Sequence, residues 1–106
     1  MNQGSRGINK VFLSGLVVGR ISFDSTENGS GACSFELETS RPAANGTTVG
    51  AVVKVNAYGR LVEMCRRQLE VDSYVVLEGE LMNRRGKYGP ILEVRSRDIL
   101  FDMNGV

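Results

Sequence analysis

The sequence predicts a mainly β protein, a five-stranded Greek-key barrel with one helix between the third and fourth strands. Three observations predict this fold class. Apolar and polar residues alternate in five short segments, as they do in half-buried strands. One segment, between the third and fourth of these, has the spacing of an amphipathic helix instead. Clusters of Gly, Asn and Ser separate the segments and predict turns.

The first two strands are predicted over residues 10–18 and 32–40. Gly15 and Gly19 lie inside or just after the first of them, and predict the kind of bend that a barrel corner needs. A turn cluster at 24–31 separates the two strands. In the second strand, the residues expected to share one face are Cys33, Phe35 and Leu37.

The third strand is predicted over residues 49–58, after a loop that contains an Asn45-Gly46 turn. Val53 and Val55 take one face of this strand. After Gly59 the spacing changes to that of a helix of about ten residues. Its apolar side is expected to comprise Leu61, Val62, Cys65 and Leu69.

Two further strands, at 74–83 and 90–101, complete the predicted barrel around a basic hairpin loop at 84–89. One face of these strands is expected to carry Val75, Leu77, Leu81, Leu92 and Val94, and the opposite face of the last strand Glu93, Arg95 and Arg97. Phe35 and Phe101 are expected in the core. The 106 residues have room for one domain, with its core over about residues 6–102.

The residue types present argue against catalysis. The chain contains no histidine, which removes the commonest general base and the imidazole metal ligand. Cys33 and Cys65 lie far apart in apolar segments and are expected to be buried free thiols. A structural zinc needs four ligands, for which the chain has too few candidates. We therefore expect no enzyme, no metal and no cofactor.

Charge and hydropathy limit where the protein can be located in the cell and what it can bind. The net charge is only +1, so a case for nucleic acid depends on where the 13 basic residues lie. No apolar stretch approaches the ~20 residues that cross a bilayer. Residues 1–10 hold no hydrophobic signal core. The expectation is a cytoplasmic protein with no membrane partner.

Three segments resemble bacterial single-stranded-DNA-binding proteins. SRGINKVFLSG at 5–15 resembles their opening strand, VVKVNAYGRLVEMC at 52–65 their third strand and helix, and YVVLEGELMNRRG at 74–86 their fourth strand and its loop. The match covers roughly residues 5–101, with these segments in the family's order. The resemblance implies an oligonucleotide-binding (OB) fold and sequence-independent binding of single-stranded DNA in replication, recombination or repair. It also implies association with the nucleoid.

The resemblance implies functional roles for several residues of this chain. Tyr58 matches a position that stacks on bases. The basic positions that approach DNA in the family are matched by Arg6, Lys10, Lys54, Arg60, Arg84 and Arg85. The family's tryptophans have no counterpart, because this chain has none. We therefore expect weaker stacking and a larger phosphate share of the binding energy.

The residues themselves support two candidate contacts. Tyr58 ends the strand whose outward face also carries Lys54 and Asn56, and single-strand binders need flat rings beside cations. The alternative is a tyrosine that packs at the barrel rim. Lys87 and Tyr88 lie in the glycine-flanked loop that also contains Arg84 and Arg85, which predicts a strand-clamping finger or a solvated hairpin tip.

Phe12 shares a face with Lys10 and Ser14. It either stacks on a base or packs in a contact between subunits. The resemblance implies a homotetramer, with a dimer as the alternative, and partners among replication or repair proteins. The acidic C-terminal tail of that family is not found in the sequence up to Val106. Two other functions stay open: a primosome-type adaptor at replication forks, and an RNA-binding barrel.

Overall fold

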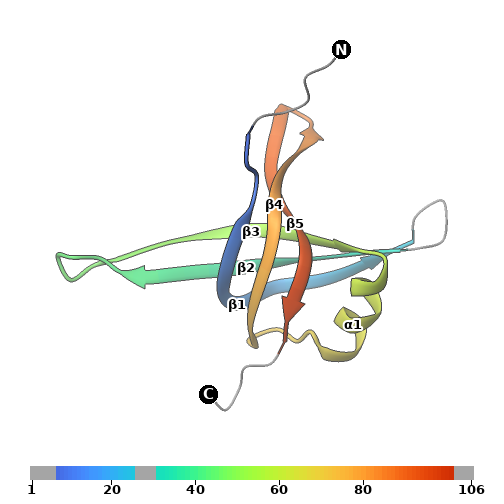
Figure 1. The fold of residues 1–106 in the computed structure, drawn as a ribbon, viewed down its shortest axis with the longest axis horizontal. Coiled ribbons are helices and arrows are strands. Elements are labelled where there is room, and N and C mark those ends of the chain that lie inside the picture. Colours follow the sequence, from blue (N-terminus) through green and yellow to red (C-terminus); the bar gives the residue numbers. More distant parts are fainter. Residues whose placement is uncertain (1–6, 26–30, 102–106) are drawn as a thin grey trace.

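Within residues 7–25 and 31–101, which the computed structural model describes, five strands and one helix follow one another in the predicted order (Figure 1). The elements are β1 (Val11–Asp24), β2 (Ala32–Pro42), β3 (Thr48–Tyr58), α1 (Arg60–Gln68), β4 (Tyr74–Gly86) and β5 (Gly89–Leu100). The strands close into a barrel in the order β1-β2-β3-β5-β4. The predicted fold class is confirmed. In this part of the chain no helix is long and apolar enough to cross a membrane.

β1 is the strand that turns the corner of the barrel. Its first half pairs with β4, from Val11 opposite Gly79 to Leu16 opposite Tyr74, and its second half pairs with β2. The register with β2 shifts between Val18 and Ser22. Gly19, inside this shift, has a φ of 75°, a conformation that glycine adopts without a steric cost. The predicted bend is therefore present, and it lets the strand continue beyond residue 18, where the sequence pattern ends.

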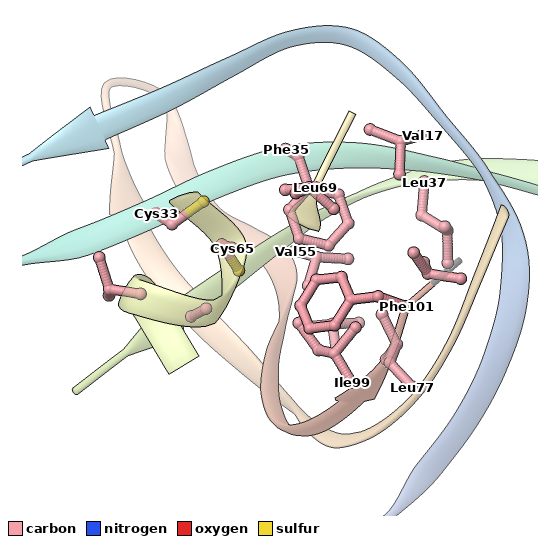
Figure 2. Packing of buried hydrophobic residues seen from close by; sticks show 14 residues of the cluster. Val17, Cys33, Phe35, Leu37, Val55, Cys65, Leu69, Leu77, Ile99 and Phe101 are labelled. Atoms are coloured by element: carbon pink, nitrogen blue, oxygen red, sulfur yellow. The ribbon is translucent and has the colours of Figure 1, made fainter. Parts of the chain in front are cut away.

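The core lies inside the barrel and under α1 (Figure 2). Phe35 and Phe101 are buried there, as predicted, and so are Val62, Cys65 and Leu69 on one side of the helix region. Cys33 of β2 and Cys65 of α1 are both buried and free. The hydrogen bond that the Cys65 thiol donates to Cys33 and the burial of this thiol both raise the pKa of Cys65. Both cysteines pack in the buried apolar cluster.

The basic segment at 84–89 is not the loop that the sequence suggested. β4 continues to Gly86 and β5 begins at Gly89, so only Lys87 and Tyr88 form the turn. Arg84 and Arg85 are strand residues, paired with Ile91 and Pro90. The sequence pattern failed here because polar side chains on a two-stranded ribbon look like a loop.

The β4–β5 hairpin extends beyond the closed part of the barrel (Figure 1). The pairing of β4 with β1 stops at Gly79, so the last residues of β4 pair only with β5. Leu92, which we expected on a core face with Val94, is 58% exposed because no third strand covers that part of the ribbon. Glu93, expected on the solvated face, is instead buried.

Candidate nucleic-acid interface

The outer face of β3 carries the first group of candidate contacts. Lys54, Asn56 and Tyr58 alternate with Val55 and Ala57, which are fully buried. Since successive side chains of a strand point to opposite faces, these three side chains share the face that points away from the core.

Tyr58 is open to a ligand. Its side chain is 38% exposed where β3 ends and α1 begins. The Arg95 guanidinium carbon lies 5.3 Å from the centroid of the tyrosine ring, within cation–π range. The ring borders a hollow of about 310 Å³ lined by Tyr58, Arg60, Leu61, Arg95, Ser96 and Arg97. A base stacked on this ring would have guanidinium groups beside it for its phosphate.

A second hollow lies across the outer faces of β1, β2 and β3. It measures about 260 Å³ and is lined by Arg20, Ser22, Ser34, Phe35, Glu36 and Lys54. Arg20 and Lys54 supply cations here, and the two serines supply hydroxyl groups. Two cations against the one carboxylate of Glu36 leave this polar hollow positive, which suits a phosphate better than a base. Lys54 joins the hollow to the face of Tyr58 along β3.

Asn56 is not free on this face. Its side chain is 9% exposed, and its Nδ2 donates a hydrogen bond of 2.7 Å to Oε1 of Glu93. Oε2 of the same carboxylate accepts a hydrogen bond of 2.6 Å from Nε of Arg84. Arg84 was expected in a mobile loop, but it lies on β4 and belongs to one hydrogen-bond network with Asn56 of β3 and Glu93 of β5.

Glu93 at the centre of this network is charged at neutral pH. Burial by itself raises the pKa of its carboxyl group. The hydrogen bonds from Arg84 and Asn56, with the positive charges of Arg84 and Lys54, outweigh burial and hold the pKa below its ordinary value. A buried carboxylate that stays ionised can orient cationic side chains around it.

The remaining candidates lie elsewhere in the structure. Lys10, directly before β1, forms an ion pair of 3.2 Å with Glu78, and its Nζ lies 5.6 Å from the Phe12 ring centroid. Phe12 lines a groove of about 370 Å³ between β1 and the β2–β3 hairpin. Tyr58 is not among the residues that line this groove. Arg6 lies outside the described residues.

The tip of the β4–β5 hairpin carries the last of the candidate contacts. Tyr88 is 92% exposed, and the Nζ of Lys87 lies 5.5 Å from its ring centroid. Arg84 and Arg85 line a hollow of about 510 Å³ with the hairpin glycines. The structure thus brings together Lys54, Asn56, Tyr58, Arg60 and Arg84. Arg84 also lines the hollow at the hairpin, whereas none of these five residues lines the Phe12 groove.

Arg20, Arg95 and Arg97 are basic residues of these hollows that were not predicted from the sequence as ligand contacts. Arg95 comes beside Asn56 through the parallel pairing of β3 with β5. Period-two alternation does place Arg95 on an outer face, but it does not say which strand lies alongside. Arg20 follows the bend at Gly19, after the predicted strand had ended, so no pattern assigned it to a face.

These features define a class of protein. A closed five-stranded barrel with one helix between the third and fourth strands is the OB fold, and an exposed ring among cations on its β3 face is typical of single-strand binders. The crystal structure of a small single-stranded DNA-binding protein from Streptomyces coelicolor matches with a TM-score of 0.75 at 22% identity, covering 89% of this chain and 92% of that one.

The sequence itself assigns the family. The model described as the single-strand binding protein family matches residues 8–97, and the chain belongs to this family. A search of curated protein sequences finds no match. The resemblance and the fold expected from three short segments are confirmed.

Proposed function

We propose that this chain binds single-stranded DNA without sequence preference and protects it in replication, recombination or repair, in the cytoplasm at the nucleoid. The observation that carries the proposal is the exposed Tyr58 ring with Arg95 at 5.3 Å, on a face that also presents Lys54 and Arg60. Every base has a flat face that can stack on such a ring, and every nucleotide has a phosphate for the cations. Family membership supports the same function.

The division of the binding energy follows from the residue types. The chain has no tryptophan, and Tyr58 is the ring on the β3 face. Stacking contributes ~1–3 kcal/mol per base, and a single ring on this face can stack on only one or two bases. Lys54, Arg60, Arg84 and Arg95 supply cations around it. Phosphate contacts therefore account for a large share of the affinity.

The test is a salt titration with oligo-dT. If those four cations each neutralise one phosphate, log K is expected to fall with log salt at a slope of about −2.8, which is about −0.7 per phosphate. A duplex of equal length is expected to bind at least about tenfold more weakly, because its bases are already stacked. Fluorescence anisotropy with a labelled oligonucleotide measures both quantities.

The alternatives are distinguished in the same assay. Affinity that does not respond to salt contradicts the phosphate share, and equal affinity for duplex contradicts stacking. A preference for RNA of the same sequence would favour an RNA-binding barrel. Little affinity for any single strand, with capture of a replicative helicase, would favour the adaptor.

We also propose that the chain assembles with itself, as a homotetramer or, failing that, a dimer. The support is an exposed apolar strip on neighbouring strands β1, β4 and β5. Leu16 pairs with Tyr74 and Val76 with Leu100, and all four side chains are exposed. Such a strip is typical of an interaction surface. Light scattering is expected to give a mass four times that of one chain, and the mass of a single chain would refute the assembly.

A further inference from the structure

We propose that Glu93 is a positioning residue for nucleic-acid binding: its carboxylate orients the exposed Arg84 side chain toward the ligand, so removing this negative charge weakens the binding of a polyanion. The inference rests on the proposed function and assigns a role to a residue that reads as an ordinary surface carboxylate in the sequence.

Glu93 is held on two sides by candidate ligand contacts. Its side chain is 1% exposed. One carboxylate oxygen accepts from Nδ2 of Asn56 on β3 at 2.7 Å, and the other accepts from Nε of Arg84 on β4 at 2.6 Å. Both oxygens are therefore used within the protein. A carboxylate shielded in this way binds no solvent cation and makes no direct contact with a phosphate.

The bond to Glu93 leaves Arg84 free to bind a ligand. It uses Nε, and an arginine has four further N–H donors on its two terminal nitrogens. The Arg84 side chain is 47% exposed. Because the guanidinium group is planar, fixing Nε on Glu93 also fixes the direction of the terminal donors, which match the two oxygens of a phosphate. Glu93 thus selects one orientation of a long side chain that would otherwise sample many.

Charge and orientation predict opposite signs for the same substitution. Glu93 lies between Arg84 and the charge of Lys54, both of which stabilise its ionised form. If only net charge mattered, removing the carboxylate would make the face more positive and tighten its hold on a polyanion. If orientation matters more, the same change releases Arg84 and weakens binding. The direction of the effect therefore decides between the two.

The experiment compares Glu93→Gln with Glu36→Gln. Glu36 is the matched control because it pairs with Lys54 across β2–β3, and its exposed carboxylate lines the hollow that Arg20 borders. Glu93→Gln is expected to weaken oligo-dT binding about fivefold to tenfold, since a charge-assisted hydrogen bond no longer orients Arg84. It should also reduce the steepness of the salt slope by about 0.7, which is one phosphate contact. Glu36→Gln should bind as tightly as the wild type or more tightly.

Two further variants separate positioning from a folding defect. If Glu93 acts through Arg84, the double variant Arg84→Ala/Glu93→Gln should bind within about twofold of Arg84→Ala alone. Arg84→Lys leaves Glu93 in place and keeps the charge, but one ammonium group cannot hold Glu93 and fork onto a phosphate, so about fivefold weaker binding is expected. Melting curves confirm that each variant is folded.

The inference is overturned if folded Glu93→Gln binds as tightly as the wild type or more tightly, or if its salt slope is unchanged. It is equally overturned if Arg84→Lys binds like the wild type. If the wild type binds oligo-dT and these variants bind it with the same affinity, the role of Glu93 is refuted and the proposed function stands. A wild type that does not bind oligo-dT refutes the proposed function, and this inference with it.

Discussion

Tyr58→Ala is expected to weaken the binding of oligo-dT by about 1–3 kcal/mol, which is about fivefold to 150-fold in Kd. The reason is the position of the ring: it is exposed at the end of β3, beside Arg95 and the hollow that Arg60 and Arg97 also line. Removing it takes away the flat surface for a base and leaves the cations in place. The salt slope should therefore change little, although the affinity falls.

Two matched variants sharpen this result. Tyr58→Phe keeps the ring and loses only the hydroxyl group, so its Kd should stay within about threefold of the wild type if stacking is the source of the energy. Tyr88→Ala removes the exposed tyrosine of the hairpin tip, which lines neither of the two hollows beside Lys54 and Tyr58. A larger loss of affinity from Tyr88→Ala than from Tyr58→Ala would move the site to the hairpin.

Phe35→Ala is expected to lower the free energy of unfolding by about 3–5 kcal/mol. The Phe35 side chain is 1% exposed and packs in the core with Leu69, Val55 and Leu37 (Figure 2). Alanine leaves a cavity that the closed barrel cannot collapse to fill. A domain of this size is stable by about 5–15 kcal/mol, so the variant keeps only a fraction of its stability.

Phe12→Ala is the control, since the Phe12 ring is 69% exposed. Its effect is expected to stay within about 0.5 kcal/mol, as for most surface substitutions. Urea unfolding at one fixed chain concentration measures both variants. Equal destabilisation by the two would show that Phe12 is buried in solution, and hence that it lies in a contact between chains.

The fold could be predicted because its signals are local. Period-two alternation located each strand, the change of spacing after Gly59 located α1, and Gly19 marked the corner where β1 leaves β4 for β2. Each depends on residues a few positions apart. The end of β4 could not be predicted from such signals, because Arg84 and Arg85 are as polar in a paired ribbon as in a loop.

The site could be predicted only in part, because half of it depends on which strands are neighbours. Tyr58 and Lys54 follow from the alternation of one strand. The burial of Glu93 follows from β3 and β4 approaching β5 from opposite sides, where Asn56 and Arg84 close over the carboxylate. No local pattern marks a carboxylate that distant strands will cover. The same holds for Arg95, which reaches Tyr58 through the parallel pairing of β3 and β5.

The most direct measurement is a titration of ¹⁵N-labelled protein with oligo-dT, followed by amide chemical shifts. A single strand lying along β3 should shift the amides of Lys54 to Tyr58, together with those of Arg95 and Arg84. Shifts confined to the groove around Phe12 and Thr39, with the Tyr58 amide unmoved at saturation, would contradict the placement of the strand on this face.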